Sequence, residues 1–218
     1  FITVTIQKKI EAVNGDDMSW IKHIPFEQAE GKLLKLYKRV KGPDNNVDNI
    51  MLAHSLRPHT MEGHMVMYKN VLHHTGNKIP KWLLEAMGVL TSMLNGCTYC
   101  VDHHFSGMER LVDDNERAKK IRQALESEQF SDAFDERQAA ALHYTKKLSC
   151  TPAQMSEDDI AKLHSSGWDD GEVLEINQVV AYFNYANRTV LGLGVHTDGD
   201  IIGLSPNVSE DPDNWNHS

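Results

Sequence analysis

The chain has 218 residues, enough for one domain or two small ones, and long enough to bury a sizeable core. Apolar residues make up 40% and charged residues 24%, a globular composition that argues against a disordered or fibrous chain. The formal charge of −9 disfavours nucleic acid and anionic membrane as partners, because both attract basic surfaces. No apolar run reaches the roughly 18–20 residues of a membrane-spanning helix, so no membrane partner is expected.

Residues 1–7 alternate apolar and polar side chains, which predicts a short edge strand or an extended arm, and we assign 1–20 to an N-terminal arm. Beyond the arm, nearly every periodic segment has the spacing of an amphipathic helix. Apolar stripes, together with Gly, Pro and capping signals, predict helices over residues 26–41, 47–56, 60–75, 80–94, 97–112, 115–129, 135–148, 156–166 and 169–193. The expected fold class is therefore all-α, with a single helical domain over residues 21–195.

Residues 196–218 are rich in Gly, Pro, Asn and Asp, and we interpret them as a C-terminal tail, for which the surface of a neighbouring subunit is a candidate. Two parts of the domain also show a weak internal similarity. Glu85 lies 12 residues before Cys97, and Glu175 lies 12 residues before Asn187, in helices of similar apolar pattern. Either a duplicated helical unit or a chance similarity between helices explains these equal spacings.

The chain has three cysteines, an odd number that is too small for a secreted disulfide framework. A reducing, cytoplasmic location is therefore the expectation. In such a compartment a close cysteine pair is typical of redox chemistry or of metal binding, and Cys97 and Cys100 form such a pair. Cys150 follows a predicted helix end and is interpreted as an inert, packed thiol.

The cysteine pair and His104 share one face of their predicted helix, because the spacings from Cys97 to Cys100 and from Cys100 to His104 are i, i+3 and i, i+4. The Asn95-Gly96 break puts the pair at the helix start, where a disulfide closes with the least distortion. Unpaired amides and the positive end of the helix dipole favour a thiolate there, and a histidine one turn on can hold the proton. The segment thus supplies an attacking thiol, a resolving thiol and a base.

Glu85 lies on the preceding predicted helix. If the two helices pack antiparallel around the Asn95-Gly96 break, Glu85 faces His104, directly or through water. A buried carboxylate in that position would orient the imidazole. The alternatives are a solvated carboxylate near a helix N-terminus for Glu85 and an ordinary surface histidine for His104.

A zinc site is an alternative for the cysteine pair, with His103 or His104 as a third ligand, but such a site needs about four ligands and no second CxxC is present. Two buried structural thiols are a further alternative. Otherwise His103 points to a different helix face and is expected to be a surface residue. Asn187-Arg188 is interpreted as a buried polar contact between helices, with lining of the site as its alternative.

Several further side chains have two interpretations. Candidates for a substrate entry, with surface placement as the alternative, are His54, Arg57 and His64. Methionines interpreted as core or interface filler rather than as a metal site are Met61, Met65 and Met67.

The pattern Glu85-x11-Cys97-x2-Cys100-x3-His104 resembles the signature of the alkylhydroperoxidase D / carboxymuconolactone decarboxylase superfamily. The segment His54-Ser55-Leu56-Arg57-Pro58, and Tyr182-Phe183-Asn184 with Asn187-Arg188, look like the longer subgroup of uncharacterised peroxidase-related enzymes. The resemblance covers about residues 20–195.

The resemblance implies an AhpD-like all-helical bundle assembled into a homo-oligomer (dimer, trimer or hexamer). It implies that Cys100 attacks the peroxide, that Cys97 resolves the sulfenate, and that Glu85 and His104 relay the proton that activates Cys100. Tyr99 stands where the better-known hydroperoxidase has a histidine, so part of that proton network is absent or is replaced by a phenol. Decarboxylation of a lactone is not expected, because the decarboxylase members generally lack the cysteine pair.

We therefore predict a thiol-dependent peroxidase, an antioxidant oxidoreductase that reduces a hydroperoxide through a redox-active CxxC disulfide. An external dithiol would reduce the disulfide back to the two thiols. We expect no cofactor and no metal, and a low thiol pKa at Cys100. One alternative is a non-catalytic helical assembly module whose cysteine pair binds metal or acts as a redox switch. Another is a CxxC disulfide reductase, since both reactions need an activated pair.

Overall fold

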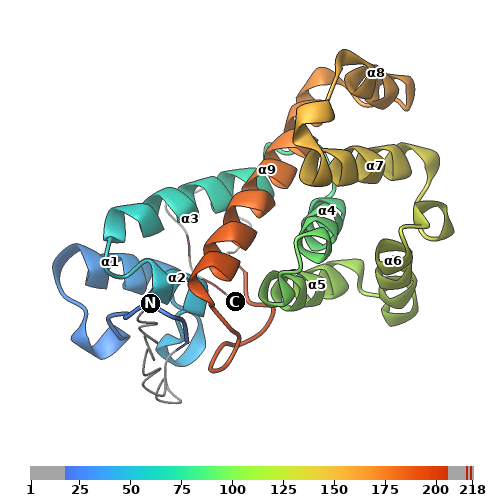
Figure 1. Cartoon of the computed structure of the whole chain (residues 1–218). Helices are drawn as coiled ribbons and strands as arrows, with labels where there is room; N and C mark the ends of the chain where they lie inside the picture. The colour runs from blue at the N-terminus through green and yellow to red at the C-terminus, as the bar shows by residue number, and fades with distance from the viewer. Residues whose placement is uncertain (1–17, 206–214, 216, 218) are drawn as a thin grey trace, which may run out of the picture.

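The computed structural model describes residues 18–205, 215 and 217, and in this part of the chain nine α-helices and four short 3₁₀ turns are present, with no strand (Figure 1). The α-helices are α1 (Gly31–Val40), α2 (Asn49–Ala53), α3 (Pro58–Leu72), α4 (Lys81–Leu94), α5 (Thr98–Val112), α6 (Asn115–Ser127), α7 (Glu136–Cys150), α8 (Glu157–Ser165) and α9 (Asp170–Leu193). The 3₁₀ turns are η1 (Phe26–Gln28), η2 (Pro43–Asn45), η3 (Phe130–Asp132) and η4 (Pro152–Gln154). The all-α prediction is confirmed.

The helix boundaries follow local chemistry where the sequence marks it. Gly96 takes a left-handed conformation, with φ of +70°, and this lets the chain reverse between α4 and α5. At the start of α8, the backbone N–H of Ser156 donates to Asp159 Oδ2 at 2.8 Å, which completes the predicted capping box.

The first predicted helix, over residues 26–41, is wrong in its first half. The chain there forms the turn η1, then an extended Ala29 (ψ of 137°) and Glu30 (ψ of 166°), and only afterwards α1. Ala29 is buried, so it carries the apolar signal of a helix face although it lies in extended backbone. Gly31, a weak helix former with φ of +56°, stands at the junction.

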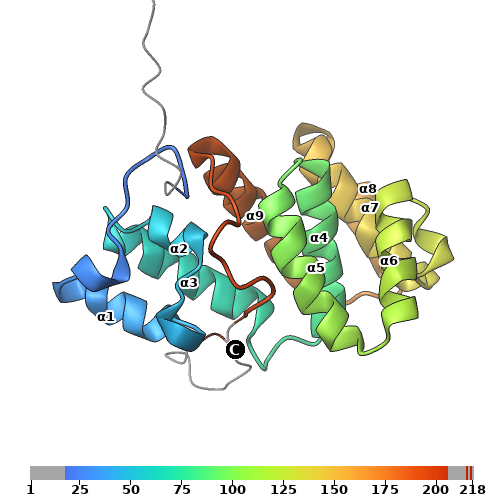
Figure 2. The same ribbon diagram turned by 90° about the horizontal axis from the view of Figure 1, so that it is seen from below.

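The long helix α9 crosses the middle of the molecule (Figure 1). Helices α1 to α3 lie on one side of it and α4 to α8 on the other, and the view from below shows the same division (Figure 2). Helix α4 packs against α5, α7 and α9, and most of its residues are buried. None of the helices in the described ranges is both long and apolar enough to cross a membrane.

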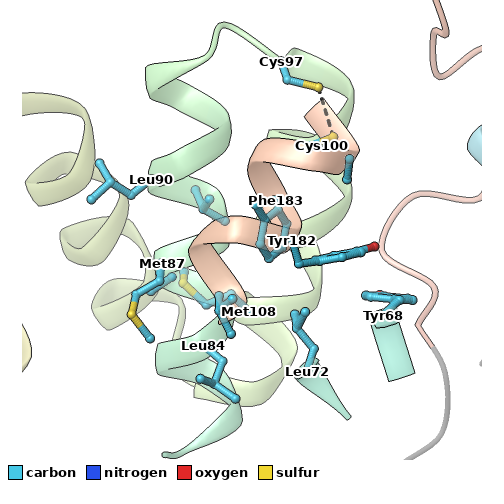
Figure 3. Close-up of a cluster of buried hydrophobic side chains, with 14 of the residues drawn as sticks. Tyr68, Leu72, Leu84, Met87, Leu90, Cys97, Cys100, Met108, Tyr182 and Phe183 are labelled. Carbon is cyan, nitrogen blue, oxygen red and sulfur yellow. Dashed lines mark hydrogen bonds between the residues drawn. The ribbon is translucent and has the colours of Figure 1, made fainter. Parts of the chain in front are cut away.

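The core contains the cysteine pair. Figure 3 shows Cys97 and Cys100 at one end of a buried cluster from α3, α4, α5 and α9 that also contains Tyr68, Leu84, Met87, Met108, Tyr182 and Phe183. Of the three methionines predicted to fill the core or an interface, Met61 and Met65 are fully buried, whereas Met67 is exposed.

The segment after α9 folds back onto its own chain and runs between α2 and α5 (Figure 2). The side-chain amide of Asn49 donates to the backbone carbonyls of His196 (2.8 Å) and Asp198 (2.9 Å). The described part of the predicted tail thus has its contacts within the same chain. The predicted strand over residues 1–7 lies outside the described residues, and the division into arm, domain and tail stays a prediction.

Candidate active site

The two cysteines lie where α4 gives way to α5. Cys97 is the N-cap residue of α5, Cys100 lies in its first turn, and both are buried free thiols. Their Sγ atoms are 3.0 Å apart and are joined by a hydrogen bond (Figure 3). A disulfide bond is about 2.05 Å long, so the pair needs an approach of only about 1 Å to close.

The two thiols differ in acidity. The hydrogen bond with the Cys100 thiol lowers the pKa of Cys97 below its ordinary value, against the opposing effect of burial. The hydrogen bond with Cys97, together with burial, raises the pKa of Cys100 well above its ordinary value. Of the two thiols, Cys97 is therefore the first to lose its proton, which is opposite to the low pKa expected for Cys100.

Glu85 and His104 meet as antiparallel packing of α4 and α5 predicts. The Glu85 carboxylate is buried, and its Oε2 lies 2.7 Å from His104 Nδ1. The imidazole is also held by rings, with its centroid 4.5 Å from that of Phe183 in an edge-to-face arrangement. Its other nitrogen, Nε2, has no hydrogen-bond partner among the residues that the structure describes. That nitrogen is available to a substrate.

Asn187 links α9 to the cysteine pair. Its Nδ2 donates to Ser92 Oγ (3.0 Å), and its Oδ1 accepts from the side-chain amide of Asn95 (3.0 Å). Hydrogen bonds from this side chain also lower the pKa of both thiols. Asn187 therefore makes the predicted buried polar contact between helices but does not line the pocket, whereas Arg188 is exposed and bonds only within α9.

A pocket with a cavity volume of about 40 Å³ opens beside the pair and is lined by Cys100, His104 and Glu85. Its other lining side chains include His64, Tyr68, Tyr182, Tyr99, His103, Asp48 and Leu204. Burial lowers the pKa of His64 to about 3 and raises the pKa of Tyr68 and Tyr182 well above the ordinary range. These three rings are therefore uncharged at neutral pH.

The prediction of His103 as a surface residue is wrong. His103 is buried because the C-terminal segment covers it, and its Nε2 lies 3.2 Å from Asp200 Oδ2. Its ring stacks on Tyr99 with centroids 4.6 Å apart, and the Tyr99 hydroxyl donates to the same carboxylate oxygen at 2.7 Å. Beside them, burial raises the pKa of Asp48 to about 7.

Nothing in the sequence predicts Tyr68, Asp48 or Asp200 as site residues. Tyr68 has the spacing of a core stripe, and Asp200 lies in a stretch interpreted only as a tail. No local signal marks either aspartate, because each acquires its role from a segment far away in the chain.

The remaining candidates divide between the interior and the surface. His54 is buried, with Nδ1 2.8 Å from Thr60 Oγ1, but it does not line the pocket, and Arg57 is exposed. The interpretation of Cys150 as a packed thiol is wrong, since it ends α7 and is exposed. Glu175 accepts the backbone amides of residues 78 and 79, so it does not repeat the contact of Glu85.

Residues 18–205, 215 and 217 contain no ligand set for the zinc site considered as an alternative. No group of three or more His, Cys, Asp and Glu side chains is arranged there as a metal ion would need. The cysteine pair instead has hydrogen-bonding partners, chiefly each other and Asn187.

No family model matches the chain. Over 133 residues it is 20% identical to the uncharacterized protein YdfG of Bacillus subtilis (strain 168), a match that covers 61% of this chain and 88% of YdfG. A solved structure from Ralstonia eutropha JMP134, an uncharacterized peroxidase-related protein with an alkylhydroperoxidase AhpD core, superposes with a TM-score of 0.69 at 19% identity. That superposition covers 83% of this chain and 92% of the other.

Two further solved structures have the same architecture. An uncharacterized peroxidase-related protein from Silicibacter sp. TM1040 gives a TM-score of 0.64 at 22% identity, covering 89% of this chain and 95% of that one. The debrominase Bmp8 in complex with 2,3,4-tribromopyrrole gives 0.59 at 20% identity, covering 82% and 90%. Together with the all-helical architecture, these likenesses show that the chain has the AhpD-like fold.

Proposed function

We propose that the protein is a thiol-dependent peroxidase that reduces hydroperoxides through Cys100 and Cys97. The observation that carries the proposal is the position of Cys100. Its side chain lines a small pocket together with the hydrogen-bonded Glu85–His104 pair, and a second sulfur lies 3.0 Å behind it. The peroxidase-related names of the structural neighbours support the same class of chemistry.

The reaction begins with the proton that the two sulfurs share. It passes from Cys100 to Cys97, and the Cys100 thiolate attacks the terminal oxygen of the hydroperoxide. The O–O bond breaks, Cys100 becomes a sulfenic acid, and the leaving alkoxide takes a proton from His104, which acts as the general acid. The hydrogen bond to Glu85 holds the imidazole in place for this transfer.

The Cys97 sulfur then attacks the sulfenic sulfur of Cys100. Hydroxide leaves as water with the proton that began on Cys100, and a Cys97–Cys100 disulfide remains. One hydroperoxide is thereby converted to an alcohol and water at the expense of two thiols. An external dithiol reduces the disulfide, and a homo-oligomer in a reducing cytoplasm is the setting that we propose.

The size and burial of the site favour a hydroperoxide over other substrates. A cavity that admits a benzene-sized ring is roughly 150 Å³, whereas this pocket is about 40 Å³, which is small for a brominated pyrrole. The relative exposures of Cys97 and Cys100 are 0% and 3%, so a disulfide of a folded protein cannot approach them in this conformation.

The test uses reduced, metal-free protein carrying Cys150→Ser, because Cys150 is an exposed thiol that would consume peroxide on its own. Stopped-flow measurement with hydrogen peroxide should show thiol loss much faster than that of a free cysteine, and mass spectrometry should find a Cys97–Cys100 disulfide. Cys97→Ser should stop at the sulfenic acid of Cys100, and Cys100→Ser should not react. Thiols that react no faster than free cysteine would contradict the proposal.

A further inference from the structure

One wall of the pocket comes from the chain's own C-terminal segment. Gly203, Leu204 and Ser205, which we call the C-terminal wall, line the pocket together with Cys100. Figure 2 shows this segment running between α2 and α5 after α9 has ended. The wall is therefore a separate piece of chain added to the helices that carry the thiols and the Glu85–His104 pair.

The C-terminal wall is anchored by a buried carboxylate. The Asp200 side chain is 1% exposed, and its Oδ2 accepts the Tyr99 hydroxyl at 2.7 Å and lies 3.2 Å from His103 Nε2. Its Oδ1 accepts the backbone N–H of Asn49 at 2.9 Å. Because Tyr99 lies between the two cysteines, the anchor joins the wall directly to the redox helix.

The wall also lies tightly on α5. The Arg110 guanidinium donates to the carbonyl of Gly203. A Cβ atom at Gly203, where φ is +86°, would approach Ser106 Oγ to 2.4 Å. On its other side, the Leu204 side chain packs against Gly42, where an added Cβ would lie 2.7 Å from Leu204 Cδ1. Leu204, which lines the pocket, is therefore held by its own contact with Gly42 and by the seating of the neighbouring Gly203 on α5.

The space that remains is small. A single water needs at least roughly 10–15 Å³, and a benzene-sized ligand needs a cavity of roughly 150 Å³. At about 40 Å³, the pocket has room for hydrogen peroxide or a short alkyl group, but not for an aryl or branched one. Three of the rings that line it, His64, Tyr68 and Tyr182, are uncharged at neutral pH.

We propose that the C-terminal wall restricts this site to hydrogen peroxide and the smallest alkyl hydroperoxides, with Leu204 as the side chain that sets the limit. This inference rests on the peroxidase function proposed above and adds the substrate class. Aryl hydroperoxides would be excluded by size alone.

The kinetic test compares hydrogen peroxide with cumene hydroperoxide in wild type, Leu204→Ala and Ile202→Ala. Ile202 is the matched control, because it lies on the same segment, is exposed and does not line the pocket. Wild type should strongly prefer hydrogen peroxide in kcat/KM. In Leu204→Ala the ratio of cumene hydroperoxide to hydrogen peroxide should rise at least about tenfold, as the loss of a bulky apolar barrier predicts. Ile202→Ala should leave the ratio as it is.

The inference is overturned if wild type reduces both peroxides equally well, or if Leu204→Ala leaves the ratio unchanged. A second readout does not depend on peroxidase activity. The alkylation rate of Cys100 is followed by peptide mass spectrometry in the Cys150→Ser background, with iodoacetamide as the small reagent and N-benzylmaleimide as the bulky one. Leu204→Ala should speed the bulky reagent selectively. If Leu204→Ala speeds alkylation by the bulky reagent but no variant reduces either peroxide, the role of the C-terminal wall in limiting access would stand and the proposed peroxidase function would be refuted.

Discussion

Glu85 Oε2 and His104 Nδ1 lie 2.7 Å apart, although the two residues are 19 positions apart and belong to different helices. The contact exists because α4 and α5 run antiparallel on either side of the turn at Gly96. It connects a buried carboxylate to the imidazole that lies one helical turn beyond Cys100. The arrangement makes the two side chains a single unit in the proposed reaction.

Replacement of either member of this unit should slow the oxidation of Cys100. We expect His104→Gln to lower the rate constant for reaction with hydrogen peroxide by about 100-fold or more, the usual contribution of a general acid or base. Glu85→Gln should lower the same rate constant by about 10–100-fold, because it removes the carboxylate that orients the His104 imidazole. In stopped-flow measurements the double variant should be about as slow as His104→Gln alone. Effects that multiply would mean that the two residues act independently.

The acidity of the thiols should depend on Asn187. Asn187→Ala removes hydrogen bonds that lower the pKa of both Cys97 and Cys100, so the pH profile of thiol alkylation should move to higher pH. The same change leaves Ser92 Oγ and the Asn95 amide without this partner, and should lower the free energy of unfolding by about 1–3 kcal/mol. Arg188→Ala, at the exposed neighbouring position, is the control, and an equal shift there would refute a direct role of Asn187.

The packing of α4 on α9 should not tolerate a methyl group at Gly88. A Cβ atom there would lie 2.2 Å from the Phe183 ring, which itself contacts the ring of His104. Gly88→Ala should lower the free energy of unfolding by about 1–3 kcal/mol in urea titrations. Gly63→Ala in α3, with nothing within 4 Å of its Cβ, should instead raise it by about 0.5–1 kcal/mol. Equal effects at both positions would contradict the close packing.

Asp48 should give stability an unusual pH dependence. Its pKa is raised by burial to about 7, from the ordinary value of 3.8, so between about pH 4 and 7 the folded state holds a proton that the unfolded state has lost. The contribution of Asp48 to the free energy of unfolding is therefore full below pH 4 and is lost as the pH rises through 7, by at most about 1.4 kcal/mol per pH unit.

The measurement is urea unfolding of wild type and Asp48→Asn across this pH range. The stability of the variant relative to wild type should rise steadily from pH 4 to pH 7. Four buried histidines with lowered pKa, His54, His64, His73 and His217, titrate in the opposite direction below about pH 6.5. Both proteins contain them, so the effect of the first three cancels in the difference, whereas His217 Nε2 lies 3.9 Å from Asp48 Oδ2 and is coupled to it. A difference that is constant with pH, as expected for the exposed Asp44→Asn control, would show that Asp48 is not buried as a neutral acid.

Features that depend on residues close together in the chain can be predicted from the sequence alone. The helix ends at Asn95-Gly96 and the capping box at Ser156 depend on chemistry within a few positions. The shared face of Cys97, Cys100 and His104 is a property of helical spacing. Even the meeting of Glu85 with His104 needs only two neighbouring helices and one tight turn. The all-α fold class and the candidate redox residues were therefore determined by the sequence.

The tertiary structure decided what depends on distant segments. His103 is buried because Asp200, 97 residues away, brings the C-terminal segment over it. Cys97 rather than Cys100 is the more acidic thiol because burial and hydrogen bonds, including those from Asn187 on α9, set the pKa of each sulfur. The pocket is likewise lined by Leu204, which is far from the thiols in the chain. Periodicity and capping report contacts within a few turns, whereas burial and acidity are set by whichever remote side chains pack against a group.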